Sequence, residues 1–65
     1  MTINYTPLWK TLLDKGIKKT DLCQKIGIST ATVAKMSKNQ VISMEVIIRI
    51  CEELNCRIEE VCEII

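Results

Sequence analysis

The side chains of this 65-residue sequence that could take part in chemistry are few, and they include no His. General acid–base catalysis would therefore depend on Asp, Glu, Lys, Cys or the single Tyr. A chain of this length also leaves little room for a concave substrate pocket, which usually measures on the order of several hundred Å³. We therefore expect a protein that is not an enzyme and that has no catalytic residue.

Four cysteines, Cys23, Cys51, Cys56 and Cys62, are the residues most able to form a disulfide or hold a metal. The segments between them contain 27, 4 and 5 residues, so no pair has the close spacing of common zinc sites, and no His completes a mixed ligand set. The N-terminus shows no secretory signal, so the even count does not indicate a disulfide framework. We expect reduced thiols that mostly pack in the core of a cytoplasmic protein, with no metal and no cofactor. A disulfide and a four-cysteine metal site are the alternatives.

Charge is divided unevenly along the chain, although the net charge is only +1. Residues 1–44 carry seven Lys and two Asp, whereas residues 45–65 carry two Arg and six Glu. Such a basic first part can face an anion such as nucleic acid, although two solvated helix surfaces of opposite sign would give the same pattern. No apolar run is longer than the three residues Val46 to Ile48, so the sequence predicts no contact with a membrane.

Capping residues divide the chain into five predicted helices. The expected N-caps are Thr6, Thr20, Ser29 and Ser43, with Pro7 in the first helical position of its helix. The expected left-handed C-caps are Gly16, Gly27 and Asn55. These signals place helices at 7–15, 21–26, 30–36, 44–54 and 58–63, after a short extended arm over residues 2–5 and with a loop over 37–42. Apolar side chains recur on one face of each helix, which predicts a single all-α domain over residues 1–65, built as a compact five-helix bundle.

Two of these helices, 21–26 and 30–36, are joined by a three-residue turn that begins with Gly27. Glycine suits this position because a Cβ atom is disfavoured at positive φ. The side chains that would fill the corner between the two helices are small or apolar: Leu22, Cys23, Ile26, Ile28, Val33 and Met36. This spacing is typical of a helix-turn-helix.

The sequence resembles the Cro/cI-type (XRE) family of helix-turn-helix DNA-binding proteins over essentially its whole length. The similarity is strongest over Lys19–Met36, and it continues through Tyr5–Leu13 and Val41–Cys56. The chain departs from the family pattern in four places. It has Cys23 where Ala is usual, Lys19 where Gln is common, and Arg57 where Asp or Ser is common. The loop after the predicted helix 30–36 has Lys38–Asn39 where Asn-Gly is common. The resemblance implies a lambda-repressor-like bundle. It also implies a small stand-alone transcriptional regulator that binds double-stranded DNA sequence-specifically, with repression as the expected effect.

In this motif the second helix enters the major groove with its N-terminal residues near the base edges. The base contacts implied by position are Thr30, Ala31, Thr32 and Lys35. The implied phosphate contacts are Lys19, Ser29, Lys38 and Asn39, together with the first amides of the two helices. The alternative is that these residues simply begin a helix and that the lysines are solvated.

Apolar side chains that the predicted core does not use indicate an interface with another protein chain. The expected interface residues are Val46, Ile48, Ile64 and Ile65. We expect a homodimer through the last two predicted helices, because one small module covers little DNA and paired half-sites are the usual solution. A protein-interaction module, such as an antitoxin-like partner of another protein, is the alternative function.

Overall fold

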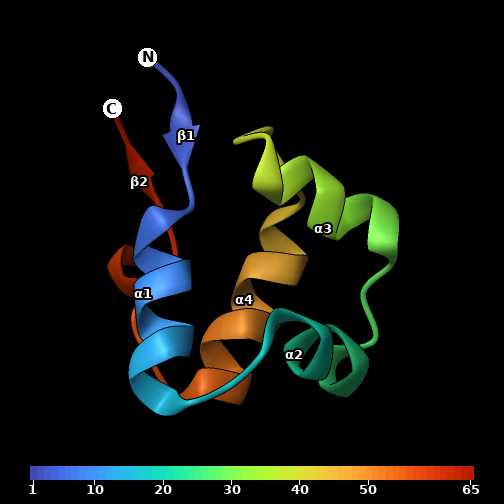
Figure 1. Cartoon of the computed structure of the whole chain (residues 1–65). Coiled ribbons are helices and arrows are strands. Elements are labelled where there is room, and N and C mark those ends of the chain that lie inside the picture. The colour runs from blue at the N-terminus through green and yellow to red at the C-terminus, as the bar shows by residue number, and fades with distance from the viewer.

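Four α-helices, one 3-10 turn and a two-stranded ribbon make up the fold, and the computed structural model describes every residue from 1 to 65 (Figure 1). The strands are β1 (Ile3–Asn4) and β2 (Glu63–Ile64), and the 3-10 turn is η1 (Ile58–Glu60). The helices are α1 (Thr6–Lys15), α2 (Lys19–Ile26), α3 (Thr30–Ser37) and α4 (Met44–Leu54). Figure 1 shows α4 between α1 on one side and α2 and α3 on the other, with both chain ends at the tip of the ribbon.

Most helix ends lie where the capping residues predict them. The chain leaves α1, α2 and α4 through left-handed residues, and these are Gly16 (φ 67°), Gly27 (φ 71°) and Asn55 (φ 49°). Ser29 caps α3 by accepting a hydrogen bond from the Thr32 N–H, and Ser43 caps α4 by accepting one from the Val46 N–H. The predicted C-caps and these two N-caps are therefore confirmed.

The core lies where the helices meet and contains nine buried side chains. They come from every helix and from the segments that flank the ribbon: Tyr5, Leu8, Leu12, Leu22, Met36, Ile47, Ile50, Leu54 and Val61. No buried side-chain nitrogen or oxygen lacks a hydrogen-bond partner. None of the helices combines the length and the apolar character that crossing a membrane would require.

The starts of α1 and α2 differ from the sequence-based prediction. Thr6 is the first residue of α1 rather than its cap, and both its N–H and its hydroxyl donate to Asn4 Oδ1, at 3.3 and 2.9 Å. Helix α2 begins at Lys19, two residues early, so Thr20 lies inside it and no side chain caps its start. The helix begins early because the Leu22 N–H already bonds to the Lys18 carbonyl, at 3.1 Å.

The predicted fifth helix over 58–63 is wrong. The fold is mostly helical as predicted, but it has four α-helices rather than five and also contains a small two-stranded ribbon. The chain makes only the 3-10 turn η1, in which the Arg57 N–H donates to Glu60 Oε2 at 2.9 Å, and then extends into β2. Strand β2 pairs antiparallel with β1, placing Ile64 opposite Ile3. The bonds Thr2 N–H to Ile65 O (2.8 Å) and Ile65 N–H to Thr2 O (2.9 Å) continue the ribbon. Backbone groups that a helix would have satisfied locally thus bond to the other end of the chain.

Candidate nucleic-acid interface

Helices α2 and α3 meet at the predicted three-residue turn. The Gly27 and Ile28 N–H groups both donate to the Cys23 carbonyl, at 2.9 and 3.2 Å, which closes the end of α2. Leu22 and Met36 are buried on the two sides of the corner, and Cys23 lies half-buried between the helices. Burial raises the pKa of the Cys23 thiol, so at neutral pH this side chain is an uncharged packing group.

The predicted base-contacting residues all lie in the first turns of α3. Thr30, Ala31 and Lys35 are exposed, and Ala31 and Lys35 are one helical turn apart. Thr32 is half-buried, and its hydroxyl lies 3.1 Å from Ser29 Oγ. The structure thus presents three of the four side chains freely to solvent and holds the fourth at the helix cap.

The segment after α3 is held in place by the buried Tyr5. The Tyr5 hydroxyl donates to the Gln40 carbonyl at 2.8 Å, and its N–H donates to Asn39 Oδ1 at 3.3 Å. Asn39 adopts a left-handed conformation (φ 55°). Its backbone N–H donates to the Met36 carbonyl at 3.1 Å, and its side-chain amide nitrogen, Nδ2, makes no hydrogen bond within the chain. Lys38 is exposed beside it. Two predicted phosphate contacts therefore project from a loop whose backbone is fixed.

Lys19 lies at the start of α2, and its Nζ atom is 4.0 Å from the centre of the Trp9 ring. The sequence alone does not predict this contact, because the two residues lie on different helices and follow no shared periodicity. The N-cap residue of α2, Lys18, was also not identified, although it is exposed and supplies a second positive charge at the same helix end. The pair Lys18–Lys19 next to a predicted helix start was the available signal.

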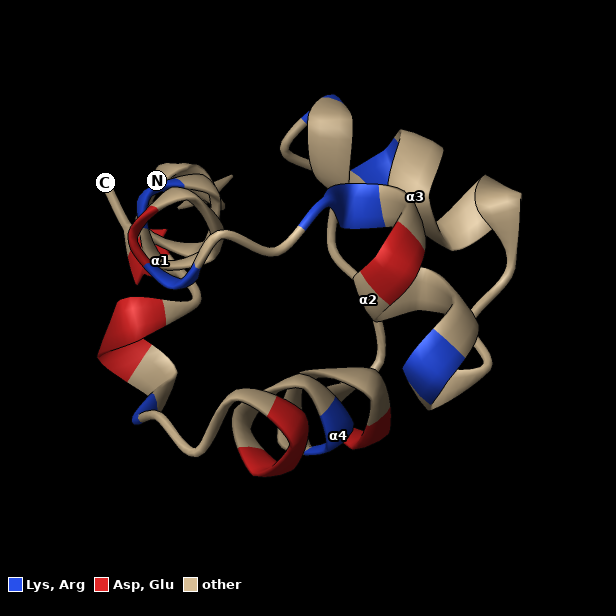
Figure 2. Ribbon diagram, turned by 60° about the horizontal axis from the view of Figure 1, so that its bottom comes forward, with Lys and Arg blue, Asp and Glu red and all other residues tan.

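The distribution of charge separates the helix-turn-helix from α4 and η1. Figure 2 shows mainly basic segments on α2 and α3, although Asp21 adds an acidic one to α2. Mainly acidic segments lie on α4, which also carries Arg49, and on the turn that follows it. The two ion pairs join Lys25 to Glu53 (3.7 Å) and Arg49 to Glu45 (2.9 Å). Lys19, Lys35 and Lys38 make no ion pair, so their charges are available to an anion.

Comparison with known proteins agrees with this geometry. The protein-family model of the Cro/C1-type HTH DNA-binding domain matches residues 7–65 of this sequence. This chain belongs to that family. The crystal structure of the transcriptional regulator VanUg, Form II, is 40% identical to the chain with a TM-score of 0.93, and the match covers 95% of this chain and 83% of that one. A comparison with curated proteins finds no significant match.

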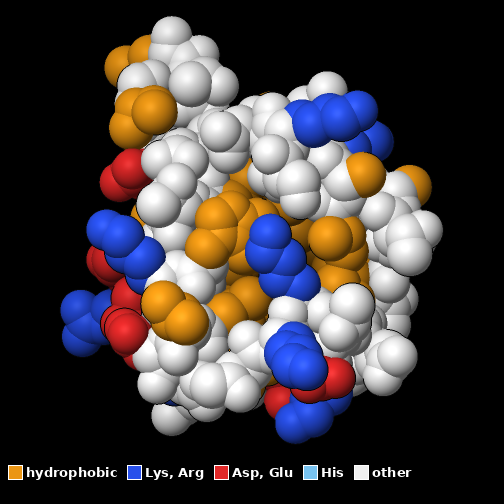
Figure 3. Space-filling view, viewed as in Figure 1, with side chains coloured by type: hydrophobic (Ala, Val, Ile, Leu, Met, Phe, Trp, Pro, Cys, Tyr) orange, Lys and Arg blue, Asp and Glu red, His pale blue; other side chains and the backbone are white.

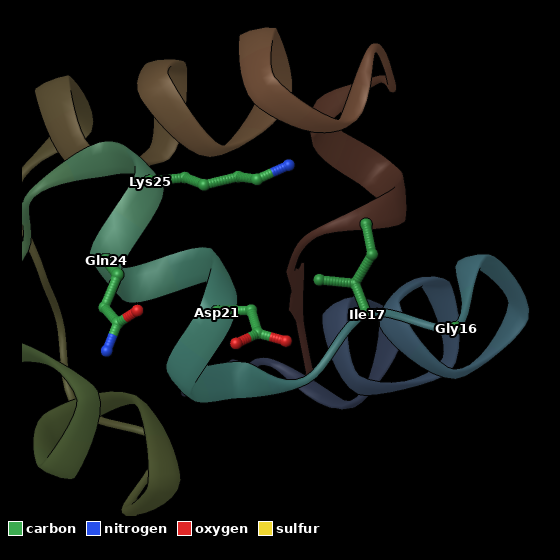
Figure 4. A pocket seen from close by; sticks show the side chains of 5 residues that line it. All are labelled: Gly16, Ile17, Asp21, Gln24 and Lys25. Atoms are coloured by element: carbon green, nitrogen blue, oxygen red, sulfur yellow. The ribbon is translucent and has the colours of Figure 1, made fainter.

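A depression between the end of α1 and α2 of this Cro/C1-type domain has no lining residue from α3. Figure 4 shows its lining residues, Gly16, Ile17, Asp21, Gln24 and Lys25. The Lys25 side chain extends along α4, where it pairs with Glu53, whereas Gln24 points away from it. Small-molecule sites usually hold polar groups that converge on one point. The depression does not have that arrangement.

The four cysteines of the domain are free thiols, and each is half-buried. Cys51, Cys56 and Cys62 pack against the core from α4 and the segments around η1. Burial raises the pKa of the Cys56 and Cys62 thiols, and the nearby Cys51 thiol raises both further. No group of three or more Cys, Asp or Glu side chains is arranged to hold a metal ion.

The predicted interface residues lie on two separate apolar surfaces. Ile48 is 52% exposed and lines a groove, here called the α4–η1 groove, whose apolar walls are Met44, Ile47, Ile48, Cys51, Cys56 and Ile58. Ile64 is 63% exposed and lines a different hollow with Met1, Ile3 and Val41. Ile65 is exposed at the chain end, and Val46 is half-buried against the core.

Proposed function

We propose that this chain is a sequence-specific DNA-binding transcriptional regulator that inserts α3 into the major groove and acts as a repressor. The observation that carries the proposal is the exposed N-terminal face of α3, flanked by lysines that pair with no carboxylate. The similarity to VanUg, a transcriptional regulator, supports the same function. The four cysteines are free thiols, which agrees with a protein that binds DNA in a reducing cytoplasm.

The side chains on α3 suit a limited reading of the base edges. A Thr hydroxyl such as that of Thr30 can donate or accept, Ala31 can contact a thymine methyl, and Lys35 can reach guanine O6 and N7. This face has no Arg, Asn or Gln, which are the strong bidentate readers of guanine and adenine. We therefore expect modest discrimination at each half-site. Thr32 is the weakest of the four candidates, because its hydroxyl already faces the Ser29 cap.

Phosphate contacts would come from both ends of the helix-turn-helix. Lys19 stands at the uncapped start of α2, where the first amides are free to donate to an anion. Lys38 and the free side-chain amide nitrogen of Asn39 follow α3. The Ser29 hydroxyl would add a contact while it caps α3. These contacts set the position of the domain on the duplex and make its affinity depend on salt.

Repression follows from occupancy. A domain bound over an operator blocks access to that stretch of DNA, and it needs no further surface to do so. A reporter gene placed behind the selected operator would show lower expression when the protein is present. Higher expression would contradict the assignment as a repressor.

We also propose a homodimer that forms through the α4–η1 groove, which Ile48 lines, with a contribution from Val46 on the same helix. Two-fold dimers are the usual way for a small module to bind paired half-sites. Ile48→Lys should raise the dimer dissociation constant measured by sedimentation equilibrium. Leu13→Lys is the matched control, because Leu13 is 80% exposed on α1 outside both apolar surfaces. A monomer mass independent of concentration would refute the dimer. Ile64 lies on the separate surface at the ribbon, with Ile65 beside it at the chain end, so Ile64→Lys should have the smaller effect on this contact.

The experiment that tests DNA binding is a titration of a fluorescein-labelled, mixed-sequence duplex at several salt concentrations. Affinity should fall steeply as salt rises, with a slope of about −0.9 for each phosphate neutralised. Lys19→Ala should reduce the slope by about one. Binding that is absent, or indifferent to salt, would refute the proposal.

The α4–η1 groove supports a second candidate function, a protein-interaction module such as an antitoxin-like partner. The groove is apolar, and Glu52 lies on its border. Under this function a second, different protein would co-purify with the chain, and Ile48→Lys would release it while leaving DNA binding unchanged. A neighbouring small, toxin-like reading frame would favour this function over the first.

A further inference from the structure

The lysine at the start of α2 lies against the single tryptophan of the chain. Lys19 Nζ is 4.0 Å from the centre of the Trp9 ring, well within the distance at which a cation is attracted to an aromatic face. Figure 3 shows a basic side chain lying over hydrophobic atoms on this face of the molecule. Lys19 is exposed and makes no ion pair, so the ring is the partner that holds its ammonium group.

Trp9 itself is held firmly by the helix-turn-helix. It projects from α1 and is half-buried against the corner residues, which are Leu22, Cys23, Ile28, Val33 and Met36. The free space enclosed among these side chains is about 10 Å³, no more than a single water molecule needs. Because the ring cannot follow a mobile lysine, the position of the ring restrains the ammonium group.

We infer that Trp9 is a positioning residue for DNA binding, which holds the Lys19 ammonium beside the uncapped first turn of α2, where a phosphate binds. The inference rests on the proposed function. An ammonium group has three N–H donors, and contact with one ring face leaves donors for a phosphate oxygen. A free lysine loses rotamer entropy when it binds, and a lysine already restrained by a ring loses less. The ring thereby strengthens the contact without touching DNA.

The test is a double-mutant cycle in the whole chain, with a labelled mixed-sequence duplex as the probe. Trp9→Leu removes the aromatic face and keeps an apolar side chain, and Lys19→Met removes the charge. Trp9→Leu should weaken duplex binding about threefold, as expected for an exposed cation–π contact. It should have no further effect in the Lys19→Met chain. Trp9→Phe keeps an aromatic face and should restore most of the affinity.

Lys15→Met is the matched control for loss of charge. Lys15 is exposed in the last turn of α1 and lies near the Cys56 thiol rather than the ring. Lys15→Met should change duplex binding by the same factor in the chain that keeps Trp9 and in the Trp9→Leu chain. Circular dichroism of each variant verifies that the helices are intact.

Emission from Trp9 gives a second readout, because no other tryptophan contributes. Duplex binding should change this emission in the unmodified chain and leave it unchanged in the Lys19→Met chain. A merely structural role for the ring would not produce that difference.

Three results would overturn the inference. An equal loss of affinity from Trp9→Leu with and without the Lys19 charge would mean that the ring acts only through packing. A gain of affinity from Trp9→Leu would mean that the ring competes with phosphate for the ammonium group. Absence of duplex binding by the unmodified chain would refute the proposed function, and the inference with it.

Discussion

Tyr5→Phe tests how strongly the ribbon end of the molecule fixes the loop after α3. The Tyr5 side chain is fully buried, and its hydroxyl donates to the Gln40 carbonyl at 2.8 Å. Phenylalanine keeps the ring and removes only this hydrogen bond. A typical net hydrogen bond contributes about 1 kcal/mol, and a carbonyl left without its partner adds to the loss. We expect a loss of about 1 to 2 kcal/mol in the free energy of unfolding.

That loss is large for so short a chain. Stability of about 0.05 to 0.15 kcal/mol per residue gives this domain about 3 to 10 kcal/mol in total. In a domain of this size 1 kcal/mol lowers the melting temperature by about 4 to 8 °C. Urea unfolding followed by far-UV circular dichroism would measure the change directly. Duplex affinity should also fall slightly, because Lys38 and Asn39 lie on the same loop.

Thr6→Val provides the comparison for an exposed hydrogen bond. The Thr6 hydroxyl donates to Asn4 Oδ1 at 2.9 Å at an exposed position, where water can replace the bond. Its loss should cost less than about 0.5 kcal/mol. If Tyr5→Phe costs no more than Thr6→Val, the Tyr5 hydroxyl does not fix the loop.

Three further predictions concern the helix-turn-helix and its thiols. Gly27→Ala should lower the free energy of unfolding in urea by about 1 kcal/mol. The loss comes from backbone strain alone, because φ is 71° and nothing lies within 4 Å of an added Cβ. An unchanged free energy of unfolding would contradict the left-handed turn. Ser29→Ala should cost about 1 kcal/mol through loss of the α3 cap, and an unchanged melting temperature would show that the cap does not contribute. Because burial raises the pKa of Cys23, Cys56 and Cys62 in the folded state, the unfolded state loses its protons first above about pH 9, and stability should fall as the pH rises further. Cys23→Ala should reduce that fall in a series of urea titrations, and an unchanged pH dependence would contradict the burial of this thiol.

The parts of the fold that sequence predicted are those decided by local backbone chemistry. Gly27 and Asn55 end helices because few other residues adopt a left-handed conformation readily. Ser29 and Ser43 begin helices because a hydroxyl oxygen can accept a hydrogen bond from an amide of the first turn. Each signal lies within three residues of its effect.

The largest error, the fifth helix, arose where distant segments decide the structure. The apolar spacing of Ile58, Val61 and Ile65 fits a helix, but the chain over 63–64 pairs with residues 3–4 instead. The Leu8 N–H donates to the Val61 carbonyl at 3.1 Å, which holds this segment against α1. No local sequence pattern predicts such a pairing between the two ends of the chain.

The candidate site also has one part that the sequence predicts and one part that only the structure shows. Position on α3 identified Thr30, Ala31 and Lys35 as exposed side chains, because a helix-turn-helix fixes which face is free. The contact between Trp9 and Lys19 depends on how α1 crosses the start of α2, so it required the structure.

Selection of bound duplexes from a random DNA pool tests most directly whether α3 reads DNA sequence. We expect a palindromic consensus whose affinity falls steeply with salt. Repeating the selection with Lys35→Ala should relax one base position in each half-site, whereas Lys19→Ala should weaken all sequences equally. If no sequence is enriched and no salt-dependent binding is found, the helix-turn-helix is a scaffold and the claim that α3 reads DNA is wrong.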